Sequence, residues 1–373
     1  MFASIVGAIS NFMYSYLLIV MLVAVGLYYT LRTRLVQLRM FRETIRVILE
    51  KPEGKDAVSS FQALMVSTAS RVGTGNIIGI STAICLGGYG AVFWMWVIAL
   101  VGGASAFIES TLAQIYKKRG EHGSYGGPAY YIEAALGSRA LAVLFSIALI
   151  ATYGVGFNML CAYNLQSTFI AYSFYNPTTT PWVIGAVLAV LVGYCLFGGG
   201  RRVIAATSTL VPIMGVIYIS VAFVLTLLNI GQLPTVVGKI FSQAFDFQAI
   251  FSGFAGSCVM FGIKRGLYSN EAGVGSAPNA AAAADVSHPV KQGLVQMLSV
   301  FIDTLLICTA TAFMCMTSGV EPVKELAGAP YVQTALAASM GGVAKVSLYP
   351  WCFLPSLPCW AICTMLTTAL PTL

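Results

Sequence analysis

The chain has 373 residues, of which 58% are hydrophobic and only 9% charged, and its mean hydropathy is +0.84. A soluble protein carries roughly 25% charged residues to cover its surface. The composition therefore excludes a water-soluble globular protein and predicts an all-α polytopic membrane protein in contact with a lipid bilayer. The formal net charge of +7 is interpreted below from its distribution along the chain, and no nucleic-acid partner is expected.

Eight apolar runs of about 20 residues or more, the length that crosses a bilayer, follow one another along the chain. They are 12–31, 60–87, 90–116, 140–175, 181–198, 203–229, 247–268 and 293–317. No positively charged region precedes the first run, which is long enough to span, so we interpret it as a retained transmembrane helix. A short amphipathic stretch, 331–345, and a proline-rich apolar tail, 347–373, come after the eighth run.

Lysine and arginine are unevenly divided between alternate loops. With the N-terminus outside the cell, most of the 20 Lys and Arg residues fall in inside segments. The basic segment 32–56 is the richest of these, and Lys264 and Arg265 are counted in a later one. Because cytoplasmic loops hold the excess of Lys and Arg, the distribution predicts a multi-pass protein of the cell membrane with its N-terminus outside.

Two of the predicted spans contain glycine and polar residues near their middle. The second span is interrupted within 70–79, and the seventh within 252–257. Glycine costs about 1 kcal/mol per helix position relative to alanine, and clustered glycines mark backbone that unwinds or is closely approached. For each span alone, tight helix packing through a pair such as Gly75 and Gly79 is an equally good explanation.

The relation between the two interruptions favours a functional explanation. They lie five spans apart, and the charge distribution has these two spans crossing in opposite directions. Interrupted spans at matching positions of two oppositely oriented five-helix units are typical of an inverted-repeat secondary transporter. Unwound backbone within a membrane lines a cavity or is buried in protein, so its amides and carbonyls can bind a carboxylate and a sodium ion.

Five motifs along the chain resemble those of a known transporter family. They are Gly73–Ile77, Gly90–Trp96, Gly126–Tyr131, Arg265–Pro278 and Phe301–Thr304. Over residues 12–346 they resemble the alanine or glycine:cation symporter family, also called the sodium:alanine symporter family, of the amino acid–polyamine–organocation superfamily. The resemblance implies a sodium-coupled importer of alanine or glycine, with a LeuT-type inverted-repeat bundle of ten core helices and one extra N-terminal helix.

The segment 70–76 is also similar, more distantly, to the unwound segment of the neurotransmitter:sodium symporter family. The similarity implies that the amides of Thr74 and Gly75 bind the substrate carboxylate, and that residues 253–256 receive the amine and side chain, with Phe254 as a lid. The implied substrate-binding residues are Gly73, Thr74, Gly75, Asn76, Gly253, Phe254, Ala255 and Gly256. The implied sodium ligands are the carbonyls of Ala69 and Val72 and the side chain of Asn76.

Other polar side chains lie in or beside the predicted spans, where charge is costly. Arg71 is interpreted either as a fixed cation that replaces a sodium ion or binds a substrate carboxylate, or as the partner of a buried carboxylate. Glu109 and Asp303 either mark a functional interior or pair with Arg71 or Arg265. The remaining polar residues face the substrate cavity or neighbouring helices (Asn158, Asn164, Gln166), or form a helix cap or an inner gate (Asn270, Glu271).

These features divide the chain into four parts. They are an extra N-terminal helix with a basic linker, 1–56, a first five-helix repeat, 57–230, a partial second repeat, 231–346, and an apolar tail, 347–373. The resemblance ends near Lys345, and three prolines follow within Pro350–Pro358. We interpret the tail as the product of a frameshifted or truncated coding sequence, which leaves the second repeat incomplete.

The sequence thus predicts a secondary active transporter that couples uptake of a small neutral amino acid, alanine or glycine, to sodium by alternating access. A proton-coupled or cation-independent amino acid exchanger, with Arg71 in the place of the cation, is the alternative. A membrane-embedded enzyme is disfavoured because the chain contains no HExxH, GxSxG or GxxxxGK[ST] pattern. A channel is disfavoured because no short filter-like repeat occurs.

Overall fold

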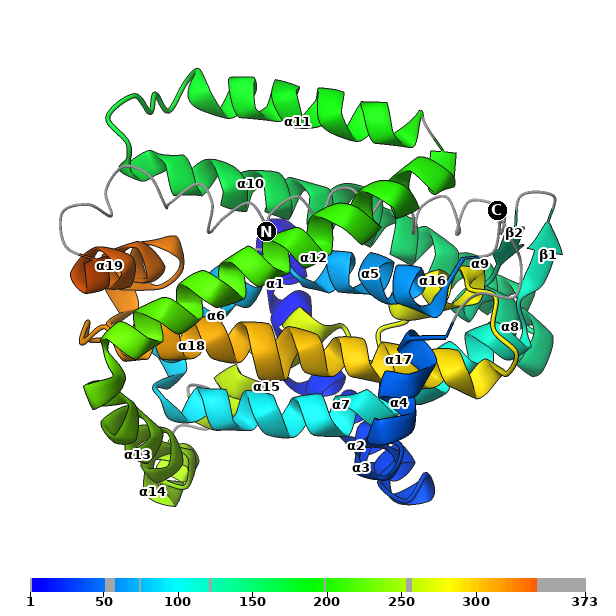
Figure 1. Cartoon of the computed structure of the whole chain (residues 1–373), viewed down its shortest axis with the longest axis horizontal. Coiled ribbons are helices and arrows are strands. Elements are labelled where there is room, and N and C mark those ends of the chain that lie inside the picture. The colour runs from blue at the N-terminus through cyan, green and yellow to red at the C-terminus, as the bar shows by residue number, and fades with distance from the viewer. Residues whose placement is uncertain are drawn as a thin grey trace.

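The computed structural model describes residues 2–50, 58–73, 75–120, 123–197, 199–252 and 257–340. Nearly all of this is helix (Figure 1). The exception is a small antiparallel hairpin, β1 (Lys118–Gly120) and β2 (Gly123–Tyr125), with Arg119 opposite Ser124. An all-α fold was expected, and the hairpin escapes sequence reasoning because three-residue strands are too short to show an alternating pattern.

The long apolar helices agree with the predicted spans. Five of them have the length and composition to cross a membrane: Ser4–Arg32, Gly90–Ile115, Arg139–Thr168, Ser208–Leu228 and Pro289–Met316. The fifth predicted span is a shorter apolar helix, α11 (Thr180–Leu196), the second is divided into shorter pieces, and residues 253–256 of the seventh lie outside the described part of the structure. The fold is that of a helical membrane protein with several spans.

The five long helices are assembled from successive helical elements. They comprise α1 (Phe2–Phe12), η1 (Met13–Leu17) and α2 (Leu18–Arg32), then α7 (Gly90–Ile115), then α9 (Arg139–Ile150), η3 (Ala151–Phe157), α10 (Asn158–Thr168) and η4 (Phe169–Ala171), then α12 (Gly199–Leu228), and finally α17 (Pro289–Phe301), η7 (Ile302–Cys308) and α18 (Thr309–Met316). The elements η1, η3 and η7, together with η2 (Gly75–Gly79), are π-helical, a form that occurs frequently at functional sites.

The other helices are short. They are α3 (Val36–Arg39), α4 (Phe41–Ile48), α5 (Ser60–Arg71), α6 (Ile80–Gly87), α8 (Pro128–Leu136), η5 (Ile230–Gln232), α13 (Leu233–Ala244), α14 (Phe247–Ser252), α15 (Cys258–Asn270), α16 (Ala277–Ala283), η8 (Lys324–Leu326) and α19 (Ala329–Met340).

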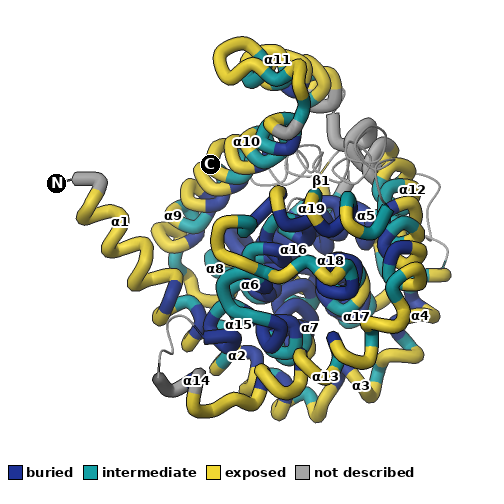
Figure 2. Tube along the Cα trace, turned by 90° about the vertical axis from the view of Figure 1, so that its left-hand side faces the viewer, coloured by how far each residue is buried: buried dark blue, intermediate teal, exposed yellow. Residues whose placement is uncertain are grey.

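Helix α7 forms the centre of the bundle and packs along α17, α15, α16 and α2. Small residues permit this close approach, since a Cβ at Gly102 would lie 2.9 Å from the Cβ of Ala272. The centre of the bundle is buried, whereas α1 and α11 at its edge are largely exposed (Figure 2). Exposed apolar residues such as Trp182, at 80% exposure on α11, are suited to contact with lipid.

Two broken helices run antiparallel through this bundle. The first comprises α5, η2 and α6, and it is broken where Val72 adopts an extended conformation. The second comprises α15 and α16, joined by residues 271–276. Asp285 donates its amide to the carbonyl of Val58 at one end of the pair, and a Cβ at Gly87 would lie 2.7 Å from the Cβ of Phe261 at the other. The two breaks therefore lie at the same level.

Helix α15 also contacts the N-terminal helix through a lysine. Lys264 Nζ donates to Ser15 Oγ at 2.6 Å and lies 5.8 Å from the centre of the Tyr14 ring. Arg265 follows Lys264 within the same helix. The assignment of these two cations to a loop was therefore wrong: they lie inside the bundle, because α15 continues past them to Asn270.

Candidate functional site

A buried polar cluster joins the first broken helix to its neighbours. Asn76 Nδ2 donates to Asp303 Oδ1 at 2.6 Å and to Ser269 Oγ at 3.2 Å, and Ser269 Oγ donates to Asp303 Oδ2 at 2.9 Å. The relative exposures of Asn76, Ser269 and Asp303 are 1%, 2% and 0%. The three residues come from η2, α15 and η7, so the cluster ties both broken helices to a third helix.

Thr304 and Cys308 complete this cluster on the η7 side. Thr304 Oγ1 donates to Asp303 Oδ2 at 3.2 Å, and Cys308 Sγ lies 3.3 Å from Ser269 Oγ. The backbone hydrogen bonds of η7 follow the π-helical pattern and not the α-helical one. The hydroxyl Oγ1 of Thr309, which follows η7, donates to the carbonyl of Thr304 at 3.2 Å. Asp303 thus has neutral donors only among its described hydrogen-bond partners.

Asn76 also closes the first break locally. The side-chain oxygen Oδ1 of Asn76 accepts the backbone amide of Gly73 at 2.8 Å, and the backbone amide of Asn76 donates to the carbonyl of Gly73 at 3.2 Å. A void of about 10 Å³ lies beside this turn and is lined by Val72, Gly73, Asn76 and Tyr218, among others. That volume is close to the smallest that holds one water molecule, so the void is far too small for an amino acid.

Arg71, in the last turn of α5, is buried and acts through space on Glu109, Glu271 and Asp303, but it forms no contact ion pair among the described residues. Its exposure is 3%, its Nη1 donates to the carbonyl of Gln296 at 3.5 Å, and its Nε and Nη2 have no partner among the described residues. An ion pair of Arg71 with Glu109 or Asp303 was expected as one possibility, and the described residues contain none. Both carboxylates accept hydrogen bonds from other groups instead.

Glu109 holds the second break in place. Its two oxygens accept the amides of Gly273 and Gly275 at 3.2 and 3.1 Å. Both glycines have positive φ, +84° and +85°, and successive amides in such a turn form a concave anion-binding nest. The carboxylate of α7 occupies this nest, so backbone hydrogen bonds hold Glu109 in place without a contact ion pair among the described residues.

Two polar residues lie at the end of α15. Asn270 Oδ1 accepts the amide of Ala272 at 3.1 Å, which closes a local turn after the helix but satisfies none of its last carbonyls, so the cap and the inner gate both stay predictions for this residue. Glu271 is the C-cap with φ +50°, and its Oε2 accepts the Ser276 hydroxyl at 2.6 Å. A non-glycine residue in the left-handed region is a strained conformation that is common at functional sites.

The predicted site residues fall into two groups. Gly73, Gly75 and Asn76 lie at the first break, and Ala69 and Val72 lie in the last turn of α5 and at its C-cap. Thr74 and the four residues 253–256 (Gly253, Phe254, Ala255, Gly256) lie outside the described residues.

Among the described residues, the non-helical segment that lies next to the first break is 271–276, within the Arg265–Pro278 motif. Phe261, near the start of α15, instead meets Gly87 at the far end of α6. Gly273 and Gly275 after Asn270 were the sequence signal for this second non-helical segment, whereas the predicted interruption within 252–257 falls largely on residues outside the described part of the structure and stays a prediction.

Two of the polar residues expected to face the cavity or neighbouring helices bond locally. Asn158 Nδ2 donates to the carbonyls of Tyr153 and Gly154 at 3.2 and 3.0 Å, within its own helix. Gln166 Nε2 donates to the Tyr175 hydroxyl at 2.7 Å. Neither side chain bonds to a residue of the two breaks.

A bundle of apolar helices in which two helices are interrupted at a buried polar site is the architecture of a membrane transporter. The chain matches the sodium:alanine symporter family over residues 1–367, and it belongs to that family. The match continues past Lys345, where the resemblance was expected to end, and residues 341–373 lie outside the described part of the structure.

Named relatives agree with this family. The chain is 44% identical over 344 residues to the probable sodium/glutamine symporter GlnT of Bacillus subtilis (strain 168), covering 91% of this chain and 71% of that protein. It is 45% identical over 341 residues to the amino-acid carrier protein AlsT of the same organism (91% and 72%). It is 36% identical over 356 residues to the sodium/alanine symporter AgcS of Methanococcus maripaludis (92% and 78%). The chain is therefore a multi-pass membrane transporter and not an enzyme.

Proposed function

We propose that this protein imports a small neutral amino acid, alanine or glycine, together with sodium by alternating access. The observation that carries the proposal is the antiparallel pair of helices broken at one level, with Asn76, Ser269 and Asp303 buried between them. Interrupted helices leave their half-helix ends at one point within the bundle, where a zwitterion and a cation can bind. The names of the relatives, which include sodium/alanine and sodium/glutamine symporters, support this class of substrate.

The coupling cation would bind at the first break. We propose the carbonyls of Ala69 and Val72 and the side chain of Asn76 as ligands, with Asp303 supplying negative charge to the same region. The void beside Val72 and Asn76 adjoins this region. Asn76 would release its bond to the Gly73 amide to turn its oxygen toward sodium. The substrate carboxylate would bind the amides of Thr74 and Gly75.

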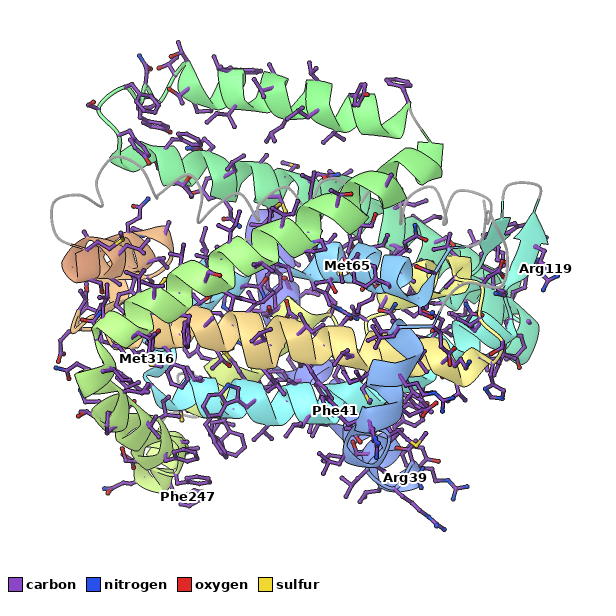
Figure 3. The ribbon with its side chains drawn as sticks, in the orientation of Figure 1. Arg39, Phe41, Met65, Arg119, Phe247 and Met316 are labelled. Carbon is purple, nitrogen blue, oxygen red and sulfur yellow. The ribbon has the colours of Figure 1, made fainter. Side chains whose placement is uncertain are left out.

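The two broken helices would belong to the two halves of a LeuT-type inverted repeat, with α1, η1 and α2 as the extra N-terminal helix. Basic residues support an orientation with the N-terminus outside the cell. Arg39 and Arg119 lie at one end of the bundle, whereas Met316 and Phe247 lie at the other (Figure 3). Because cytoplasmic ends carry the excess of Lys and Arg, the end with Arg39 and Arg119 would face the cytoplasm of the cell.

The driving force is sufficient for uphill uptake. A monovalent cation entering a cell gains about 2.3 kcal/mol per 100 mV of inside-negative potential. Since about 1.4 kcal/mol corresponds to a tenfold ratio, a neutral amino acid that enters with one sodium ion can be concentrated many-fold. One group of helices would rock about the fixed site to expose it alternately to the two sides.

Uptake into proteoliposomes tests the proposal. The purified full chain is reconstituted, and radiolabelled alanine uptake is measured with an inward sodium gradient or with potassium or choline in its place. We expect accumulation at least tenfold above empty liposomes with sodium, and its loss when an ionophore collapses the gradient. Equal uptake in all three salts would contradict sodium coupling.

A proton-coupled exchanger is the second candidate, and Arg71 favours it, because a buried guanidinium with unpartnered Nε and Nη2 could take the place of a metal cation. The same vesicles distinguish the two. Uptake driven by an inward proton gradient in sodium-free buffer, or by alanine preloaded inside, would support the exchanger and contradict sodium symport.

A further inference from the structure

A basic segment follows the N-terminal helix and is folded against the bundle as α3 and α4. Residues 32–49 contain one acidic residue, Glu43, and five arginines, all of them exposed: Arg32, Arg34, Arg39, Arg42 and Arg46. Positive charge after a span orients a membrane protein, and a flexible loop would serve that purpose equally well. The folded structure of this segment therefore calls for a further explanation.

The turn that leads into the segment is held in place by hydrogen bonds. Arg34 and Leu35 have φ of +53° and +55°, a left-handed conformation that residues other than glycine rarely adopt. The amide of Leu35 donates to the carbonyl of Thr30 at 2.9 Å. Gln37 Nε2 donates to Thr30 Oγ1 at 2.8 Å and to the carbonyl of Leu100 in α7 at 3.0 Å. The chain thus leaves α2 in one fixed direction.

Helix α4 is anchored near the end of the bundle where α17 begins. Thr44 and Val47 of α4 are fully buried. Lys291 Nζ, in the first turn of α17, donates to Oε2 of Glu50, which follows α4. In Figure 1, α4 lies across the direction of α17 and α7. Amphipathic helices that bind at a membrane–water interface lie in the plane of the membrane in the same way.

The exposed part of α4 carries an apolar stripe beside an arginine stripe. Phe41, Ile45 and Leu49 recur every four residues, so they lie along one side of the helix, and their exposures are 46%, 43% and 79%. Arg42 and Arg46 each follow one of these residues and form the neighbouring stripe. Apolar side chains that can enter the acyl layer, next to cations at the level of the headgroups, are the pattern of an interfacial helix.

The arginines have few carboxylate partners. Arg46 Nη1 lies 3.8 Å from Glu43 Oε2, an exposed pair of little strength, and the other four form no ion pair among the described residues. A guanidinium group binds a phosphate through two parallel hydrogen bonds. Clusters of about four to eight Lys and Arg next to a span are typical of binding to anionic lipids. An anionic phospholipid fits best, because its phosphate has no ammonium group beside it to compete with the arginines.

We propose that the exposed face of α3 and α4 binds the headgroups of anionic phospholipids. Arg39, Arg42 and Arg46 would bind the phosphate groups, and the apolar stripe of α4 would lie among the acyl chains. The surface would fix the end of the N-terminal helix, and through the contact of Glu50 with Lys291 the start of α17, to one leaflet of the membrane. This inference concerns a partner of the folded chain and does not depend on the transported substrate or on the coupling ion.

Spin-labelled phospholipids test the inference on the purified full chain. The protein is reconstituted in phosphatidylcholine vesicles, and electron paramagnetic resonance measures the fraction of labelled lipid that the protein surface immobilises. For the unchanged protein we expect phosphatidylglycerol to be preferred over phosphatidylcholine at least threefold in about 0.1 M salt. The preference should fall in about 1 M salt, because the screening length shortens from about 10 Å to about 3 Å.

Two double variants locate the surface. R39Q/R42Q removes two charges from α3 and α4 and should lower the preference for phosphatidylglycerol at least twofold. R119Q/R139Q removes two exposed arginines from β1 and α9, outside this surface, and should retain the preference. All four positions are exposed, so both proteins should fold, and size-exclusion profiles check this.

Three outcomes would overturn the inference. They are equal immobilisation of the two lipids by the unchanged protein, an unchanged preference in R39Q/R42Q, and an equal loss in both double variants, which would indicate a general attraction of the basic residues. The measurement contains no amino acid and no sodium gradient. A negative result would therefore leave the transport proposal standing, and failure of alanine uptake would leave this inference standing.

Discussion

Asp303 accepts hydrogen bonds from Asn76, Ser269 and Thr304, and the described residues offer it no ion pair. A buried carboxylate is costly unless it is paired or hydrogen-bonded. Its hydrogen-bond donors are all neutral and Arg71 acts on it only through space, so a cation bound beside Asp303 would supply the direct contact that the carboxylate lacks among the described residues. The sequence marked Asn76 and Asp303 separately, but their contact joins residues 227 positions apart and no local pattern encodes it.

Asp303→Asn should therefore weaken cation binding. We expect the sodium concentration for half-maximal alanine uptake to rise at least tenfold, equivalent to about 1.4 kcal/mol, with little change in the amount of folded protein. Asp285→Asn is the matched control, because Asp285 is half exposed and pairs with Lys117 at 3.6 Å. Sodium dependence is measured in proteoliposomes, and an unchanged half-maximal concentration in D303N would argue against a role of Asp303 in coupling.

Gly75 offers a graded test of the first break. A Cβ there would make an ordinary contact with the Tyr268 ring at 3.4 Å, so Gly75→Ala should retain most alanine uptake. Gly75→Leu should abolish uptake, because the longer side chain must displace the ring of Tyr268. Size-exclusion profiles check that both variants insert and fold. Wild-type uptake by G75L would show that the break is not part of the substrate path.

At the scale of elements, the apolar runs predicted the spans well because a membrane imposes length and hydropathy together. The first break was also predictable, since Gly73 and Gly75 interrupt an otherwise apolar run. The contact of Asn76 with Ser269 at the end of α15 was not predictable, because it joins residues 193 positions apart and only tertiary packing brings them together. The hydrogen bonds from Gly273 and Gly275 to Glu109 in α7 are equally invisible in the sequence.

The second break should be intolerant of a side chain. Gly275 has φ +85°, and a Cβ would lie 2.8 Å from Cζ of Phe145 and 2.9 Å from Cγ of Pro128. The left-handed conformation alone costs roughly 1–2 kcal/mol for other residues. Gly275→Ala should therefore lower the Tm of the purified protein by several degrees.

Gly185→Ala is the matched control for this substitution. Gly185 lies in α11, where a Cβ would meet nothing within 4 Å. Alanine is a better helix former than glycine, so the Tm of this variant should stay the same or rise. Thermal unfolding followed by intrinsic fluorescence compares the two, and similar Tm values would show that the joint between α15 and α16 tolerates rearrangement.

At the scale of the whole molecule, the distribution of charge predicts how the bundle is oriented in the membrane. Because Lys264 and Arg265 lie within α15 and not in a loop, fewer cations are counted at the basic end of the bundle than the sequence predicted. The segment that follows α2, with Arg39 and Arg46, still gives that end its excess. The orientation prediction therefore survives the correction.

Labelling in intact cells checks this orientation. Cysteine substitutions of Arg46, on α4, and of Lys239, on α13, lie on opposite sides of the membrane in the proposed orientation, and both positions are exposed. A membrane-impermeant maleimide should label K239C in intact cells and R46C only after permeabilisation, above the background of the unchanged protein. The reverse pattern would place the N-terminus inside.

The bond between Lys264 and Ser15 joins residues 249 positions apart. A ribosome that adds about 5–20 residues per second needs roughly 12–50 s to make the intervening chain. During that interval the first helix resides in the bilayer before α15 has been synthesised. When Lys264 enters the membrane, the Ser15 hydroxyl that it contacts is therefore already there. Assembly of the transporter thus includes a late docking step, in which the helix that contains Ser15, already able to pack against α7, gains its contact with α15.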